Sequence, residues 1–363
     1  MEGFQAAMFK PGKAISVELG NGLVDGGGVT SMREALVLCL LALSTLLSAG
    51  ASATPQADVA GEHAIAISHL ALDAKAFAPE QIKLTIYLPP GYAEEAAHGR
   101  RYPVLYANDG QDMEAVGLTQ TLSSLYAKQA IEPVIVVAID MLADRASGYG
   151  LSDRARRRSV VGGSRIGLIG SRAYEYSEWV ATQLVPYVDA HYRTQATPRG
   201  RTALGWSLGG LNAFNLGWQY PEVFGQVAAF SPSFWLAADR SSAEAVEDTR
   251  LAQAMLAHST PRQGLRFWFA IGAREETNDR NGNGIIDAVE DLEDLVQGFR
   301  APDGTQRPGL RDLGYRVDMD YAAHPSCSDD VAFYLLPDGE HNQATWKRVL
   351  PVFLGWAYGA DGR

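Results

Sequence analysis

Cysteine is scarce in this chain, because the 363 residues include only Cys39 and Cys327. Cys39 lies in an N-terminal segment that we expect to be removed, so the mature protein would keep one thiol and no internal disulfide. Zinc-type Cys/His spacing is missing as well. The fold must therefore be stabilised by a hydrophobic core, for which an apolar share of 47% is ample.

A basic excess is also lacking, because the formal net charge is −11. Binding to nucleic acid depends on basic side chains that neutralise phosphates, so no nucleic-acid partner is expected. We expect no organic cofactor either, and nothing in the sequence specifies an oligomeric state.

Long apolar runs are rare too. Residues 35–47 form one, between a basic start at residues 32–33 and small residues at 51–53. This order is typical of a signal peptide cleaved after Ala53. The run is short for a transmembrane helix, although an N-terminal membrane anchor is the alternative. Residues 1–53 are therefore interpreted as an upstream extension plus a signal peptide. The mature protein is expected to be secreted or periplasmic, with no stable membrane insertion.

From residue 58 onward, strand-length apolar runs alternate with helical patterns. Several runs are continuous rather than alternating, which is typical of strands buried on both faces. The repeated order of strand, helix and strand predicts an α/β fold in one domain of residues 58–363, with a doubly wound, mostly parallel sheet and helices on both faces. The expected strands lie within residues 82–90, 102–109, 133–140, 201–207, 226–232, 265–272 and 331–339.

The sequence TALGWSLGGLNAF places Gly205, Ser207 and Gly209 in the pattern G-x-S-x-G between a strand and a helix. A serine on a sharp strand-to-helix turn requires neighbours without a Cβ, because the strained backbone brings flanking residues close together. This context indicates a nucleophilic serine. Backbone N–H groups of Leu208 and of Gln111, in the early segment NDGQ, would form its oxyanion hole, unless NDGQ is an ordinary Asp-Gly turn.

An activated serine requires a general base and an acid that orients the base. His341 is the only histidine that follows the last expected strand, which favours it as the base. Glu275 and Glu276 both follow the strand within residues 265–272, and both are candidates for the acid. The sequence therefore predicts acyl transfer through a serine triad.

The chain resembles the putative esterase family of the α/β-hydrolases, which includes esterase D, feruloyl esterases, mycolyltransferases and siderophore esterases. The resemblance implies the α/β-hydrolase fold, Ser207 as nucleophile, His341 as base and, as acid, Glu275 three residues after Gly272. Two departures are a glutamate where many relatives have aspartate, and NDGQ where many have His-Gly. The segments that carry the resemblance are YLPPGY (87–92), RYPVLYANDGQ (101–111), LVPYVDAHYRT (184–194), GWSLGGLNAF (205–214), FSPSFW (230–235) and GEHNQATW (339–346).

A calcium-loop pattern begins four residues after Glu275. Residues 279–290 match D-x-[DN]-x-[DN]-G-x5-E, and a helical pattern follows them. This pattern is half of an EF-hand, and a calcium ion bound there would hold the loop that carries Glu275 in place. The alternative is an Asn-Gly-rich surface turn. The expected ligands are Asp279, Asn281, Asn283, the Ile285 carbonyl, Asp287 and Glu290.

These features predict a secreted carboxylic-ester hydrolase that acts on a small-molecule ester through an acyl-enzyme. An acyltransferase to a sugar or alcohol is the second hypothesis, and a non-catalytic calcium-dependent binding protein is the third. Trp206 and Trp235 either line the acyl pocket or belong to the core.

The segment between Met141 and Ala173 is rich in Gly and Arg and has no clear periodicity. It is either a solvated loop or a functional one. If it lies over the pocket, its positive charge favours anionic or catecholate esters. The arginines concerned are Arg154, Arg156, Arg157, Arg158, Arg165 and Arg172.

Overall fold

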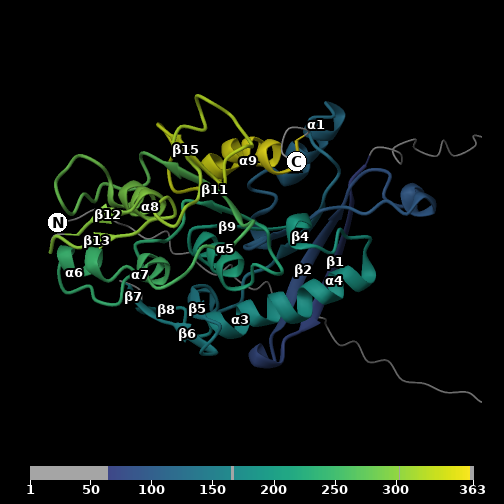
Figure 1. The fold of residues 1–363 in the computed structure, drawn as a ribbon. Helices are drawn as coiled ribbons and strands as arrows, with labels where there is room; N and C mark the ends of the chain where they lie inside the picture. Colours follow the sequence, from purple (N-terminus) through teal and green to yellow (C-terminus); the bar gives the residue numbers. More distant parts are fainter. Residues whose placement is uncertain (1–63, 165–166, 302, 360–363) are drawn as a thin grey trace, which may run out of the picture. The chain divides into compact units, whose positions relative to one another are not determined.

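The computed structural model describes residues 64–164, 167–301 and 303–359, which belong to one compact unit. Its centre is a nine-stranded sheet in the order β1-β2-β4-β3-β9-β10-β11-β15-β14 (Figure 1). Neighbouring strands are parallel from β4 to β14, while β2 is antiparallel to both β1 and β4. The strands are β1 (Ala66–Asp73), β2 (Gln81–Leu88), β3 (Val104–Ala107), β4 (Ile135–Ile139), β9 (Arg201–Trp206), β10 (Gln226–Phe230), β11 (Arg266–Gly272), β14 (Val317–Asp318) and β15 (Val331–Leu336).

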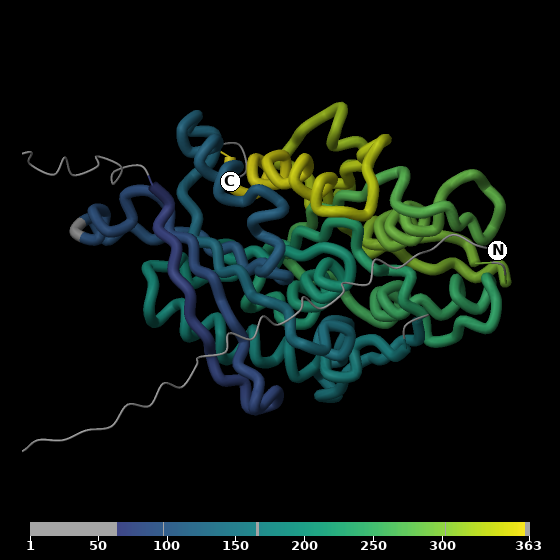
Figure 2. The backbone as a smooth tube through the Cα atoms, turned by 180° about the vertical axis from the view of Figure 1, so that it is seen from behind, coloured from purple at the N-terminus to yellow at the C-terminus, as the bar shows by residue number. Residues whose placement is uncertain are grey.

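Two hydrophobic clusters cover the two faces of this sheet. Tyr106 and Phe269 belong to the cluster that includes α3, α4, α5, α7 and α8. Their strand neighbours Leu105 and Trp268 belong to the cluster that includes α1 and α9, which lie side by side (Figure 2). The predicted fold class is confirmed. The helices are α1 (Leu118–Ala127), α2 (Arg145–Gly148), α3 (Ala173–Trp179), α4 (Val185–His191), α5 (Leu208–Gln219), α6 (Ala243–Asp248), α7 (Leu251–Ala257), α8 (Asp287–Gln297) and α9 (Gln343–Tyr358).

All seven expected strands are present, and the register aligns the ends of four of them. Trp206 pairs with Phe230, Phe230 with Ala270, and Gly272 with Leu336. The carboxyl ends of β9, β10, β11 and β15 therefore lie along one edge of the sheet. In open α/β sheets this edge carries the ligand site.

The segment between Met141 and Ala173 is not a plain loop. It contains α2 and two hairpins, β5–β6 (Leu151–Asp153 and Arg158–Val160) and β7–β8 (Gly162–Ser164 and Gly167–Ile169). β1 was not expected either, and it extends the sheet on its antiparallel side.

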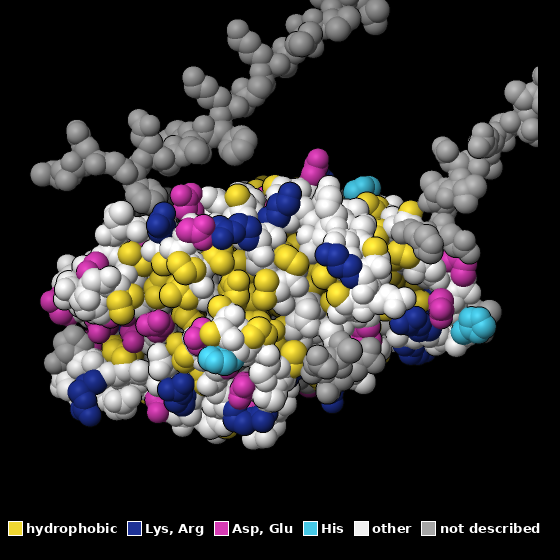
Figure 3. Space-filling model, turned by 90° about the horizontal axis from the view of Figure 1, so that it is seen from above, with side chains coloured by type: hydrophobic (Ala, Val, Ile, Leu, Met, Phe, Trp, Pro, Cys, Tyr) yellow, Lys and Arg dark blue, Asp and Glu magenta, His cyan; other side chains and the backbone are white. Residues whose placement is uncertain are grey.

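The surface seen in Figure 3 carries charges of both signs. Within the described residues, no helix has the length and apolarity needed to cross a membrane. On the face seen from above (Figure 3), basic and acidic side chains are interspersed, with apolar side chains between them. The expected signal peptide lies outside the described residues.

Candidate active site

Ser207 lies on the turn between β9 and α5 in a strained conformation, with φ 56° and ψ −126°. A Cβ added at Gly205 would lie 2.1 Å from the Gly209 carbonyl oxygen, so only glycine fits there. The Ser207 N–H donates to the Phe230 carbonyl at 3.0 Å, and the Ser207 carbonyl accepts from the Ser233 N–H at 3.1 Å. Strain at one residue, held by the adjacent strand, is the geometry of a nucleophile elbow.

His341 and Glu275 are brought together from the ends of β15 and β11. Nδ1 of His341 lies 2.8 Å from Oε2 of Glu275. The glutamate side chain is 2% exposed, whereas the histidine is 39% exposed and open to solvent. The other carboxylate oxygen accepts from the Gly272 N–H at 2.8 Å and from the Ser231 hydroxyl at 2.5 Å. The Glu275 carboxylate is therefore fixed on both oxygens, and one of them orients the imidazole.

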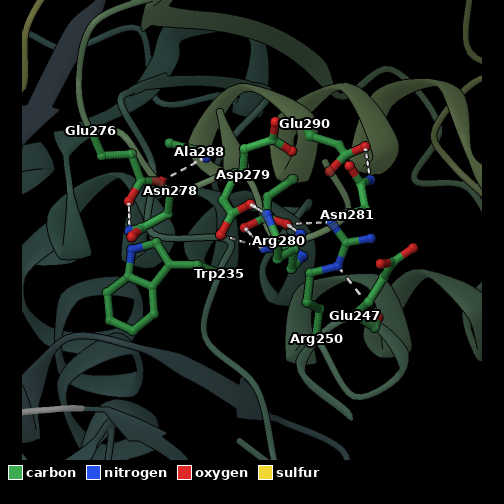
Figure 4. Close-up of polar contacts among 12 residues, drawn as sticks. Trp235, Glu247, Arg250, Glu276, Asn278, Asp279, Arg280, Asn281, Ala288 and Glu290 are labelled. Atoms are coloured by element: carbon green, nitrogen blue, oxygen red, sulfur yellow. Dashed lines mark hydrogen bonds and ion pairs between the residues drawn. The ribbon is translucent and has the colours of Figure 1, made fainter. Parts of the chain in front are cut away.

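Glu276 faces the other way, toward the start of α8 (Figure 4). Its carboxylate accepts from the Ala288 N–H at 2.9 Å and from the Asn278 side chain at 2.5 Å. Burial is the main cause that raises the pKa of Glu276, and the Asn278 hydrogen bond opposes the shift. Of the two glutamates left open by the residue pattern, Glu275 is the one that contacts His341.

Ser231 and Trp346 contact the pair of Glu275 and His341, and the sequence pattern predicted a role for neither. Ser231 has φ 47°, and its Oγ accepts from the Trp346 indole N–H at 2.9 Å while it donates to Glu275. The Trp346 ring also packs edge to face against the His341 ring, with 5.5 Å between the two ring centres. Both residues stand in segments that carry the family resemblance, FSPSFW and GEHNQATW, and that was the only available signal.

The two expected oxyanion donors lie in the first turns of helical segments, α5 and a 3₁₀ turn. Leu208 is the first residue of α5, and Gln111 lies within a 3₁₀ turn, Gly110–Asp112. The first amides of a helix have no partner within the helix and are free to bind an anion. The Gln111 side chain accepts from the Met141 N–H at 3.1 Å. It is thus turned toward the loop after β4, and only its backbone N–H suits the expected role.

The two tryptophans differ in position. Trp206 is 1% exposed, its indole N–H donates to Asp112 at 3.1 Å, and its ring stacks on Trp346 at 5.4 Å. The expectation that Trp206 lines an open pocket is therefore wrong, because the ring belongs to the core beneath the site. Trp235 is partly exposed and follows Ser233 by two residues, with the Arg240 guanidinium 5.5 Å from its ring centre.

The arginine-rich turn between β5 and β6 is distant from Ser207. The Arg154 backbone N–H donates to the side chain of Gln219, and its guanidinium to the Gln219 carbonyl, at the last residue of α5. Ser207 precedes the first residue of this helix, about 18 Å away at 1.5 Å per residue. Acidic partners also occupy the arginines: Arg154 pairs with Glu222, Arg156 and Arg158 with Asp153, and Arg157 with Glu178.

The premise that the arginine-rich segment covers the pocket is therefore wrong for Arg154, Arg156, Arg157 and Arg158. Arg172 lies over the Phe77 ring at 4.2 Å. Arg165 lies outside the described residues.

The calcium-like loop folds around Asp279, whose carboxylate accepts from the N–H groups of Gly282, Asn283 and Gly284 at 2.8 to 3.1 Å. The side-chain amides of Asn281 and Asn283 both donate to Oε1 of Glu290 at 2.6 Å. Figure 4 shows the contact that Asn281 makes. Oε2 of Glu290 is buried and has no hydrogen-bond partner among the described residues. This oxygen-rich set suits a hard cation such as calcium.

Asp287 does not join this set. Its carboxylate accepts from the Arg280 N–H at 2.7 Å and lies 3.5 Å from the Arg280 guanidinium. The predicted ligand Asp287 is therefore turned away from the loop, because it pairs with Arg280, which also pairs with Asp291. Within the described residues, no group of three or more His, Cys, Asp or Glu side chains is placed to hold a metal ion. Ile285, whose carbonyl is the remaining predicted ligand, donates its N–H to the Asn283 side chain at 2.8 Å.

Comparison with known proteins gives the family. A family model described as "Putative esterase" matches residues 76–306, well over half of the chain. The chain belongs to the putative esterase family. This esterase is therefore a carboxylic-ester hydrolase. Two proteins of Bacillus subtilis (strain 168) are similar to it. Uncharacterized protein YjcH is 26% identical over 60% of this chain and 78% of that protein. Uncharacterized protein YbbA is 25% identical over 42% of this chain and 57% of that protein.

Solved structures share the fold of this esterase at low sequence identity. A ferulic acid esterase matches with a TM-score of 0.54 and 16% identity over 82% of this chain and 98% of that chain. The enterobactin esterase of Shigella flexneri, in the presence of enterobactin, matches with a TM-score of 0.54 and 18% identity. The match covers 80% of this chain and 59% of that chain. A feruloyl esterase module of Clostridium thermocellum, complexed with sinapinate, matches with a TM-score of 0.51 and 16% identity. The match covers 82% of this chain and 89% of that chain. The esterase thus spans less than two thirds of the enterobactin enzyme and of YbbA.

Proposed function

We propose that this esterase hydrolyses its substrate through an acyl-enzyme on Ser207, with His341 as general base and Glu275 as the acid that orients it. The observation that carries the proposal is the contact between His341 and Glu275, at the same edge of the sheet as a serine held on a strained elbow. Glu275 accepts the hydrogen from Nδ1, which leaves Nε2 unprotonated and able to accept the serine proton.

The reaction then has two steps, acylation of Ser207 and hydrolysis of the acyl-enzyme. The Ser207 Oγ–H bond breaks as Oγ attacks the ester carbonyl, and its proton moves to Nε2 of His341. The carbonyl oxygen takes the electron pair, and the N–H groups of Leu208 and Gln111 stabilise its negative charge. The intermediate collapses, the C–O bond to the alcohol breaks, and His341 returns the proton to the leaving oxygen. Water repeats these steps on the acyl-enzyme and releases the acid.

The substrate class that we propose is esters of acids that carry a hydroxylated aromatic ring. Trp235 offers a partly exposed aromatic ring two residues beyond Ser233, whose N–H contacts the backbone of the nucleophile. Aromatic rings bind one another by stacking as well as by burial of apolar area. The fold relatives named above act on or were solved with ferulic, sinapic and enterobactin-type compounds. Stacking on Trp235, and not attraction by the arginine-rich turn, would then select the substrate.

Calcium binding and secretion complete the proposal. Asp279, Asn281, Asn283 and Glu290 would hold the ion, with the Ile285 carbonyl as a further oxygen ligand, and the ion would act only by ordering the loop behind Glu275. Residues 32–53 support export to the periplasm or the medium.

Labelling with a fluorophosphonate probe tests the proposed nucleophile directly. Wild type and the surface variant Ser241→Ala should label once and hydrolyse feruloyl and catecholate esters, whereas Ser207→Ala should do neither. Loss of the nucleophile costs on the order of 10⁴ or more in kcat. Near-native hydrolysis by Ser207→Ala would refute the acyl-enzyme. An added alcohol that diverts most of the acyl group into a new ester would point instead to acyl transfer.

A further inference from the structure

Asp109 and Arg145 form a buried ion pair beside the elbow, and the reaction described above does not use it. Arg145 Nε lies 2.7 Å from Oδ1 of Asp109, and Nη2 lies 2.8 Å from Oδ2. The aspartate is 1% exposed, and the arginine side chain is 26% exposed. Burial raises the pKa of Asp109, and the arginine opposes that shift. A two-pronged, desolvated pair of this kind fixes geometry more firmly than a surface ion pair does.

Asp109 also sets the backbone of the loop that carries Gln111. It has φ 56°, a left-handed conformation that costs free energy for a residue with a Cβ, and it lies two positions before Gln111. Its N–H donates to the Tyr149 hydroxyl at 3.0 Å, and the Arg145 guanidinium lies 5.2 Å from the Tyr149 ring centre. The strained loop is therefore held at its side chain and at its backbone by the same neighbouring segment.

The pair also holds the elbow. Arg145 Nη2 donates to the carbonyl of Trp206, the residue before the nucleophile, at 3.3 Å. A Cβ at Gly209 would lie 2.5 Å from Oδ2 of Asp109, so the aspartate packs directly against the first turn of α5. Beside it, the Asn108 amide donates to the Gly209 carbonyl at 2.9 Å. The loop after β3 and the elbow after β9 are thus joined on both sides of the nucleophile.

We propose that Asp109 and Arg145 are positioning residues that set the separation between the Gln111 and Leu208 amides. The inference rests on the proposed function, because those amides matter only if they bind the oxyanion. Their spacing must match the tetrahedral intermediate rather than the ester, so an error in spacing lowers kcat more than it changes substrate binding. A misplacement of about 1 Å in a catalytic group costs on the order of 10²-fold.

The test compares Asp109→Asn with Asp189→Asn, which removes the acidic partner of Arg201 at the opposite, amino-terminal end of β9. We expect Asp109→Asn to lower kcat by about 10- to 100-fold with KM within about threefold. The Ki of a trifluoromethyl ketone, which forms a tetrahedral oxyanion adduct with the serine, should rise in parallel with the fall in kcat/KM. The Ki of the product acid should stay unchanged. Asp189→Asn should leave both inhibitor constants unchanged.

Tyr149→Phe is the second variant, because it removes the acceptor of the Asp109 N–H without touching the charges. It decides the question by the same comparison if Asp109→Asn does not fold. The proposal is overturned if the folded variant lowers kcat no more than Asp189→Asn does, or if it weakens both inhibitors equally. Ser207→Ala separates the two failures: if that variant is inactive while the Asp109 and Tyr149 variants keep native kcat, only the positioning role is wrong.

Discussion

Substitution of Glu275 by glutamine should nearly abolish activity, whereas the same substitution at the adjacent Glu276 should not. A glutamine at position 275 can still accept from the Gly272 N–H and the Ser231 hydroxyl through its carbonyl oxygen. It must then present its NH₂ group to Nδ1 of His341, which holds the imidazole in the tautomer whose Nε2 carries the proton. That nitrogen cannot accept the serine proton. The expected loss is on the order of 10⁴ in kcat, about 5 kcal/mol of transition-state stabilisation.

Glu276→Gln is a closely matched control, because it makes the same chemical change one residue away. Its carbonyl oxygen can keep the hydrogen bond from the Ala288 N–H at the start of α8. We expect kcat within about threefold of wild type. The assay is steady-state hydrolysis of a p-nitrophenyl ester, with melting temperatures to show that both variants are folded. Comparable losses in the two variants, or a loss of less than tenfold for Glu275→Gln, would refute the assignment of the acid.

Two further predictions concern the region behind the acid. Chelation of calcium should lower both the melting temperature and kcat, and Glu290→Gln should have the same effect. Calorimetric titration of metal-free protein with calcium should give a Kd in the roughly micromolar to millimolar range. Absence of calcium binding would contradict the site. Burial raises the pKa of Asp294 to about 6 despite its pairing with Arg250, so the folded state binds this proton more tightly than the unfolded state does. The resulting stability, up to about 3 kcal/mol, is complete below about pH 4 and is lost as the pH rises through 6. Denaturant unfolding of Asp294→Asn should show a flatter pH dependence between 4 and 7, and an unchanged slope would exclude this group as its cause.

Much of the site could be predicted from the sequence because its chemistry follows strand ends. Buried strands appear as continuous apolar runs, and the order of strands fixes which loops share the carboxyl edge of the sheet. Glu275 and His341, 66 positions apart in the chain, follow two such strands and are in contact. The elbow at Ser207 was equally local, since two glycines and a strand-to-helix change specify it within five residues.

What only the tertiary structure decided depends on side-chain direction and on packing between distant segments. Two adjacent glutamates follow β11, and the turn after the strand directs one toward His341 and the other toward α8. Trp206 is buried because α9 places Trp346 against it. The arginines of the β5–β6 turn carry the same charge wherever they lie, but their hairpin packs along α5 to its far end. Composition and periodicity are properties of neighbours in the chain, whereas each of these outcomes depends on residues that meet only when the sheet and its covering helices are assembled.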